Sequence, residues 1–146
     1  MNSLVIRLAT IDDLDSVFEL DQEFECDKYS KDMISDILSN PNSITLVAIV
    51  NDEIVSYCTF DTVLDEASLI KIVVTKNYRG SGIGYKLLEK SKVTLESNEV
   101  KSVYLEVRSS NNIAKKLYEK IGFNKIYSRQ KYYSDGEDAD IYRLSL

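Results

Sequence analysis

The apolar residues of this chain follow two spacings, which predict alternating strands and helices. After a short apolar run over residues 4–8, apolar side chains three and four positions apart predict a helix, with Thr10 or Asp12 as its cap. Ser30 begins a second helix, and Pro41 ends it because proline and the residue before it resist a helical backbone. The first forty residues therefore indicate one strand and two helices.

The rest of the chain continues this alternation. Two β-rich runs are separated by the polar turn Asn51-Asp52-Glu53, which is typical of an antiparallel hairpin, and the last two strands meet across Asp135-Gly136. The predicted strands cover residues 4–8, 44–50, 54–60, 68–74, 102–107, 123–133 and 139–144, with later helices from Ile83 and over residues 111–121. The order βααβββαβαββ predicts an α+β fold, with helices flanking a mixed, mostly antiparallel central sheet.

Length and charge narrow the classes of function. The chain has 146 residues, and we expect a single domain over residues 1–146. Its formal net charge of −6 repels phosphate backbones, so we expect no direct nucleic-acid binding and a preference for basic partners. No apolar run is long enough to span a bilayer, and the first residues lack a signal-peptide pattern, so we expect no membrane association.

Few side chains are available for chemistry. The sequence has no His, which excludes Ser-His and Cys-His catalysis and every His-containing metal site, and we expect no metal. Cys26 and Cys58 lie far apart, so we expect both to be reduced, as in a cytoplasmic protein. Neither has the base or helix start that favours a reactive thiolate, which leaves carboxylates, Tyr, Lys and backbone amides as the main candidates.

A glycine-rich segment, Arg79-Gly80-Ser81-Gly82-Ile83-Gly84, lies where a predicted strand ends and a helix begins. Glycine lets a ligand approach the backbone closely, and the first amides of a helix attract an anion. A phosphate or pyrophosphate suits this loop, although a plain structural turn explains the same residues. A P-loop and a Rossmann loop both fit poorly, because Gly84 precedes Tyr85-Lys86-Leu87 and the spacing is G-x-G-x-G after a late strand.

Arg79, Gly82 and Gly84, after the strand at residues 71–74, match the acetyl-CoA signature R/Q-x-x-G-x-G/A, and the chain resembles the GNAT N-acetyltransferase family. The resemblance extends to the bacterial ribosomal-protein-alanine (RimI-type) branch of that family. The segments that carry the resemblance are residues 63–69, 78–88, 105–111, 117–123, 132–133 and 137–139. The Pro-Trp-Ser that such enzymes often carry appears here as Lys28-Tyr29-Ser30, and this departure falls in the region that faces the acceptor.

The resemblance implies a site for acetyl-CoA, as co-substrate, where the fourth strand splays from the fifth. The residues expected to bind it are Ile72, Val73 and Val74, through the pantetheine arm, and Arg79, Gly80, Ser81, Gly82, Ile83 and Gly84, through the pyrophosphate. An amide of Val74 or Val73 is the predicted donor to the oxyanion that develops on the thioester. Asn111 is expected to bond the pantetheine arm, unless it serves only as a helix cap.

Glu106 is the predicted general base. An α-amino group has a pKa of about 8, against about 10.4 for a lysine, so one carboxylate that relays a proton through water is sufficient to neutralise it. Glu106 ends a strand and matches the position of the base in RimI-type enzymes, although a solvent-facing strand residue would show the same pattern.

Tyr118 is the predicted general acid for the departing CoA thiolate and also a cofactor contact. It lies seven residues after Asn111, so at about 100° per residue the two side chains share one helix face. The alternative is a tyrosine at the fringe of an apolar stripe formed by Ile113, Leu117 and Ile121.

The predicted function is acetyl transfer by direct attack onto a protein N-terminal α-amine, with the N-terminal Ala of a ribosomal protein as the expected acceptor. Tyr132 and Tyr133 are expected to border the acceptor site, and an acidic rim of Asp65, Glu66, Glu137 and Asp138 to attract a basic peptide. Two alternatives remain: a small-molecule amine or lysine side chain as acceptor, and a non-catalytic module that senses acetyl-CoA. We expect a monomer or weak dimer.

Overall fold

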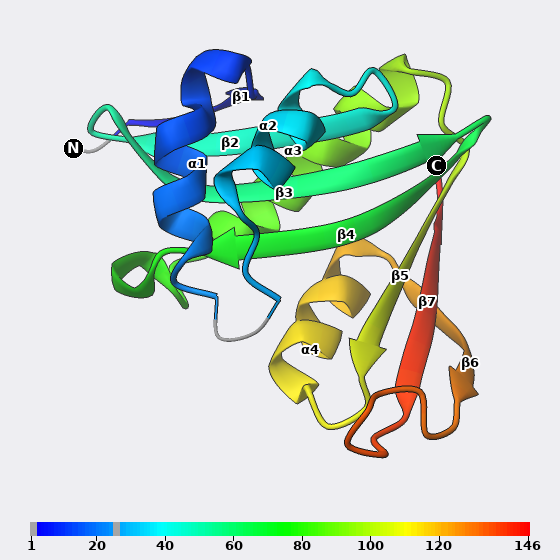
Figure 1. Ribbon diagram of the computed structural model, residues 1–146. Helices are drawn as coiled ribbons and strands as arrows, with labels where there is room; N and C mark the ends of the chain where they lie inside the picture. The colour runs from blue at the N-terminus through cyan, green and yellow to red at the C-terminus, as the bar shows by residue number, and fades with distance from the viewer. Residues whose placement is uncertain (1–2, 25–26) are drawn as a thin grey trace.

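The computed structural model describes residues 3–24 and 27–146, so Cys26 lies outside the described residues (Figure 1). They form a seven-stranded sheet in the order β1-β2-β3-β4-β5-β7-β6. Every neighbouring pair is antiparallel except β4 and β5, which are parallel. The element order along the chain is βααβββαβαββ, so the predicted fold is confirmed.

The strands are β1 (Leu4–Leu8), β2 (Ser43–Val50), β3 (Glu53–Val63), β4 (Glu66–Val74), β5 (Ser102–Arg108), β6 (Asn124–Arg129) and β7 (Ala139–Ser145). The helices are α1 (Leu14–Asp21), α2 (Lys31–Ser39), α3 (Ile83–Ser97) and α4 (Asn112–Ile121), with the 3-10 turns η1 (Ile11–Asp13) and η2 (Lys76–Tyr78). None of the helices within the described ranges has the length and apolar character needed to cross a membrane.

One prediction about the strands is wrong. The last strand but one was expected to reach residue 133, but β6 ends at Arg129. Lys131 has a φ of +51°, and its amide donates to Oδ1 of Asp138 at 2.9 Å, so the backbone turns away from the sheet. Residues 130–138 therefore form a loop, here called the β6–β7 loop, which carries Tyr132 and Tyr133.

Helices α1 and α2 cover one face of the sheet. Side chains of both helices pack on β2, β3 and β4 through Val17, Leu20, Ile34, Val47, Tyr57 and Val73. The predicted cap of α2 is confirmed, because Oγ of Ser30 accepts a hydrogen bond from the amide of Met33 at 3.1 Å. The α1–α2 segment (residues 22–24 and 27–30) lies between these helices in the chain, and the carbonyl of Asp27 accepts a hydrogen bond from Lys71 of β4.

Helices α3 and α4 belong to the larger core on the other face. Leu87, Leu88 and Leu95 of α3 and Tyr118 and Ile121 of α4 join the apolar residues of the sheet there. Cys58 lies fully buried in this core, where burial raises the pKa of its thiol to about 12. A thiol in this state is inert at neutral pH.

The parallel pair β4 and β5 stays together over only three residues. Glu66 to Ser68 pair with Ser102 to Tyr104, and beyond that point the strands diverge (Figure 1). One edge of β4 is therefore left without a neighbouring strand over most of its length. This V-shaped opening divides the sheet and creates the principal cleft of the molecule.

Strand β4 also changes the face to which its side chains point. Lys71 pairs with Thr59 and Leu69 with Phe60, so Ile70 is an extra residue that forms a β-bulge. Before the bulge, Leu69 packs in the core beside α3 and α4. After it, the alternation is shifted by one residue, and Lys71 points toward α1.

At the far edge of the sheet, β6 is exposed at all of its positions. Its register against β7 shifts between Lys125 and Tyr127, which leaves Ile126 unpaired in the ladder. The opposite edge of the sheet is β1.

Candidate active site

A cleft of about 800 Å³ lies where β4 and β5 diverge. Its walls come from the α1–α2 segment, β4, β5 with the start of α4, and the β6–β7 loop. Glu106 and Tyr118, the two predicted catalytic residues, both line it, and so do Ile72 and Asn111. The structure thus brings together residues from distant parts of the sequence.

The free edge of β4 presents alternate backbone groups to the cleft. Thr75, which follows β4, donates its amide to the carbonyl of Val55 on β3 at 2.8 Å. Backbone groups of an antiparallel strand alternate in direction, so Val73 also faces β3. Ile72 and Val74 therefore direct their amides and carbonyls toward the open side.

The glycine-rich loop forms the start of α3. Gly80 and Gly82 have φ values of +76° and +87°, and Gly82 is the residue that caps the helix. These two positions require glycine for their backbone conformation. Gly84 does not, because a Cβ there would meet Leu117, Val74 and Ile72 at ordinary contact distances of 3.7 to 3.9 Å.

Arg79 ties this loop to β4. Its Nε donates to the carbonyl of Val74 at 3.0 Å, and Oγ of Ser81 donates to the carbonyl of Tyr78. The loop therefore lies at the end of the free edge of β4, where the positive end of the fifteen-residue helix α3 is directed outward. This combination of a helix start and an open strand edge suits a ligand that has an anionic group and an extended arm.

Glu106 extends from β5 into the cleft and is exposed to solvent. Oε1 lies 3.9 Å from Nη1 of Arg129. Interaction with the nearby carboxylate of Glu106 raises the pKa of Tyr132. Tyr132 therefore lies beside the predicted base, although the β6–β7 loop and not a strand brings it there.

Tyr118 lies in α4 and lines the cleft. Its side chain is buried, and this burial raises its pKa to about 12. The ring contacts Phe123 edge-on, with a centroid distance of 5.9 Å. The hydroxyl is therefore protonated across the neutral pH range and can act as a donor.

The start of α4 departs in part from the predicted pattern. Oδ1 of Asn111 accepts from the amide of Ala114 at 3.2 Å, so Asn111 caps the helix while lining the cleft. Ile121 is buried and Leu117 partly buried, as a core stripe requires. Ile113 is 87% exposed, so its assignment to that stripe is wrong: the first turn of α4 projects past the core.

The β6–β7 loop is held against the end of β5 by Arg108. Nη1 of Arg108 donates to Asp135 at 2.8 Å and to Glu137 at 3.1 Å, and its guanidinium lies 4.0 Å from the ring of Tyr133. Glu137 also accepts from the amide of Ser110 at 3.1 Å. These contacts, here called the Arg108 latch, place Tyr133 in the wall of the cleft.

The expected acidic rim is not assembled. Glu137 is engaged by Arg108, and Asp138 accepts from the amide of Lys131. Glu66 lies where β4 and β5 are still paired, six residues of β5 away from Arg108, which is about 20 Å along a strand. The carboxylates at the two ends of β5 therefore do not form one surface, and among the described residues no cluster of His, Cys, Asp or Glu is placed to hold a metal.

Of one wall of the cleft, the sequence predicts only the stretch Lys28-Tyr29-Ser30, as part of the region that faces the acceptor. Phe24, Asp27, Tyr29 and Met33 of the α1–α2 region line this wall, together with Lys71 of β4. The signal for Lys71 was present, since it is a lone charge in an apolar strand, at a position that alternation predicts to be buried. Its partners lie about fifty residues earlier in the chain and leave no local signal.

The matches to known proteins agree with this geometry. The family model described as the Acetyltransferase (GNAT) family matches residues 10–123. A [ribosomal protein bS18]-alanine N-acetyltransferase from Haemophilus influenzae is 43% identical over 90 residues, which are 62% of this chain and only 61% of that protein. The enzyme of the same name from Haemophilus ducreyi is 33% identical over 148 residues, which cover 97% of this chain and 100% of that protein.

Solved structures have the same fold as this chain. The crystal structure of the ribosomal-protein-S18-alanine N-acetyltransferase from Escherichia coli has a TM-score of 0.87 and 32% identity, and covers 99% of this chain and 94% of that chain. The Arabidopsis thaliana protein NAA60, solved in complex with acetyl-CoA, shares the fold with a TM-score of 0.88 at 16% identity, over 99% of both chains. The resemblance that rests on Arg79, Gly82 and Gly84 is confirmed: the chain belongs to the acetyltransferase (GNAT) family and is an N-acetyltransferase.

Proposed function

We propose that this protein transfers the acetyl group of acetyl-CoA to the N-terminal α-amine of a protein, and that its acceptor is a ribosomal protein that begins with Ala. The observation that carries the proposal is the single cleft that contains Glu106 on one strand and Tyr118 on the facing helix. The names of the relatives from Haemophilus and Escherichia coli support the choice of acceptor.

The open edge of β4 and the glycine-rich loop are the proposed site for acetyl-CoA. The pyrophosphate would bind the amides from Arg79 to Gly84, and the pantetheine arm would lie along Ile72 and Val74. Alternation of the backbone favours Val74 over Val73 as the donor to the developing oxyanion, because the amide of Val74 points to the open edge of β4 and that of Val73 toward β3. Such a donor contributes about 3 kcal/mol to transition-state stabilisation.

The reaction forms an amide bond and breaks the thioester C–S bond. Glu106 accepts the proton that the amine loses, through a water molecule, and Tyr118 supplies a proton to the departing thiolate. The exposure of Glu106 suits exchange with water, and the raised pKa of Tyr118 keeps its proton in place until the thiolate forms.

The acceptor is tested with three peptides: one with a free Ala N-terminus and no lysine, one with a blocked N-terminus and an internal lysine, and one with neither amine. CoA release and the mass of the product are measured for each. We expect acetylation of the free α-amine alone. Acetylation of the lysine peptide would overturn the choice of acceptor, and binding of acetyl-CoA without turnover of any peptide would favour a small amine or a sensing role.

Glu106→Gln tests the base. Without the carboxylate the enzyme depends on amine that is already neutral, so we expect kcat to fall by about 100-fold near pH 6 and by less as the pH approaches the pKa of the α-amine. The pH profile of kcat measures this. A profile parallel to that of the wild type would remove Glu106 from the mechanism.

Tyr118→Phe tests the acid. The ring and its contact with Phe123 remain, so we expect the Kd of acetyl-CoA to change by less than about twofold while kcat falls by about tenfold or more. The pKa of Tyr118 is raised from its ordinary value of 10.0 to about 12. The wild-type enzyme should therefore lose no activity through ionisation of Tyr118 at any pH below 10. An unchanged kcat would show that another group protonates the thiolate.

A further inference from the structure

Lys71 forms an ion pair in the floor of the cleft that the proposed chemistry does not use. Its Nζ lies 2.8 Å from Oδ1 of Asp21, at the end of α1, and donates to the carbonyl of Asp27 at 2.6 Å. The Lys71 and Asp21 side chains are only 4% and 0% exposed. The ammonium therefore joins β4 to the end of α1 and to the α1–α2 segment at Asp27.

The Asp21 carboxylate accepts hydrogen bonds from two other donors. The hydroxyl of Tyr57, on β3, donates to Oδ1, and the amide of Tyr29 donates to Oδ2 at 2.7 Å. Burial raises the pKa of Tyr57, so this hydroxyl stays protonated. Asp21 thus holds the backbone of the α1–α2 segment at Tyr29, while Lys71 holds it at Asp27.

Two aromatic rings of the segment also pack on the ammonium. Nζ of Lys71 lies 3.9 Å from the ring centroid of Tyr29 and 4.5 Å from that of Phe24. Both rings line the cleft. The cation therefore fixes the side chains that face the ligand as well as the backbone that carries them.

A buried ion pair is a poor source of stability, because removing both charges from water costs about as much as their attraction returns. What this pair supplies is a single geometry for a segment that has no helix or strand of its own. Lys71 presents almost no surface to the acceptor, since its side chain is packed among Asp21, Tyr29 and Phe24.

We propose that Lys71 is a positioning residue that sets the affinity for the acceptor by holding Phe24 and Tyr29 in the wall of the cleft. This inference rests on the proposed function, in that the acceptor is a peptide which lies against that wall. Under this proposal, Lys71 affects the affinity for the acceptor and not the rate of acetyl transfer. Glu106 and Tyr118 are held by β5 and α4, and neither depends on the contacts of Lys71 and Asp21.

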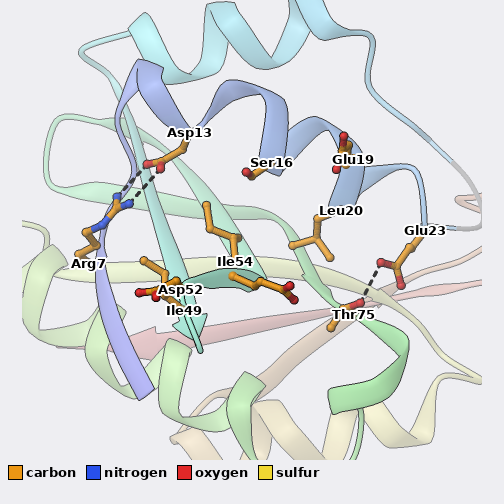
Figure 2. A pocket seen from close by; sticks show the side chains of 11 residues that line it. Arg7, Asp13, Ser16, Glu19, Leu20, Glu23, Ile49, Asp52, Ile54 and Thr75 are labelled. Atoms are coloured by element: carbon orange, nitrogen blue, oxygen red, sulfur yellow. Dashed lines mark hydrogen bonds and ion pairs between the residues drawn. The ribbon is translucent and has the colours of Figure 1, made fainter. Parts of the chain in front are cut away.

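The control is the ion pair at the other end of α1, in which the Arg7 side chain is 43% exposed. Arg7 makes two hydrogen bonds to Asp13, at 2.8 and 2.9 Å, and connects β1 to the turn before α1 (Figure 2). It lines a separate hollow, outside the cleft. Arg7→Met therefore removes a cation from the same layer of the protein without reaching the α1–α2 segment.

The kinetic test compares Lys71→Met with Arg7→Met on the Ala-initiated peptide. We expect Lys71→Met to raise KM for the peptide by about tenfold, with kcat at saturating peptide and the Kd of acetyl-CoA changed by less than about twofold. Arg7→Met should leave all three values near those of the wild type. An equal rise in KM for both variants, or a fall in kcat with KM unchanged, would overturn the proposal.

Amide hydrogen exchange of residues 27–30 gives a test that needs no acceptor, and so separates failure of this inference from failure of the proposed function. We expect Lys71→Met to speed exchange at Tyr29 by about tenfold, and Arg7→Met to leave it unchanged. If Lys71→Met does not fold, Tyr57→Phe removes one bond to Asp21 and should speed this exchange by a smaller factor. Unchanged protection at Tyr29 would overturn the proposal.

Discussion

Two walls of the same cleft are held by ion pairs of opposite character. The α1–α2 segment is tied down by Lys71 and Asp21, whose side chains are 4% and 0% exposed. The β6–β7 loop is tied down by Arg108 and Asp135, whose side chains are 39% and 60% exposed. Both arrangements bring aromatic side chains to the cleft, Phe24 and Tyr29 in the first and Tyr133 in the second.

The difference in exposure between the two ion pairs indicates how strongly each wall is fixed. Water and salt screen an exposed ion pair, so it contributes little to stability and exchanges partners readily. A buried pair is hardly screened, and loss of one partner leaves a bare charge in an apolar environment. We therefore expect the first wall to be a permanent part of the fold and the second to open and close as substrates enter and products leave.

Asp21→Ala should produce the largest effect. It leaves the ammonium of Lys71 buried without its carboxylate, which we expect to lower the free energy of unfolding by about 3 to 5 kcal/mol in urea denaturation. Asp135→Ala, the same substitution in the other wall, is the control and should leave the urea midpoint almost unchanged. Similar losses in the two variants would show that the walls are equally fixed.

Arg108→Ala should act on binding with little effect on stability. Loss of the Arg108 latch frees Tyr133, and we expect KM for the acceptor peptide to rise by about threefold at low salt. Between about 0.05 and about 0.5 M NaCl, the ratio of the two KM values should fall toward one, because salt weakens the latch in the wild type. For Lys71→Met the same ratio should stay constant. A salt dependence shared by both variants would contradict the comparison.

The smallest effect is expected from pH. Hydrogen bonds from Ser110 and Arg108 hold the pKa of Glu137 below its ordinary range. A carboxylate with a lowered pKa keeps its stabilising contacts above the ordinary range and loses them only as the pH falls through the lowered value. Between about pH 6 and about pH 9, the KM ratio of Arg108→Ala to wild type should therefore stay constant. A ratio that falls toward one near pH 6 would show that another group controls the latch.

Local signals predicted most of the fold, while the roles of Glu106 and Tyr118 stay predictions. Ser30 at the start of α2 and the glycines at the start of α3 act through their own backbone, so their roles can be seen in a few residues of sequence. The lone charge of Lys71 marks a buried position in the sequence, but its partners could not be predicted, because the bulge at Ile70 decides which face it occupies. The residue type of Tyr132 and Tyr133 predicts a strand, but contacts of the β6–β7 loop outweigh that preference.

The exposed strand β6 has a consequence for how copies of this protein meet. An open sheet edge is a template onto which another chain can add a strand, and at high concentration such edges seed aggregates. Here the unpaired Ile126 breaks the regular spacing of the edge, and Lys125 and Arg129 place a cation on either side of it. We therefore expect two such edges to pair poorly, because their cations repel and their hydrogen-bond spacing does not match.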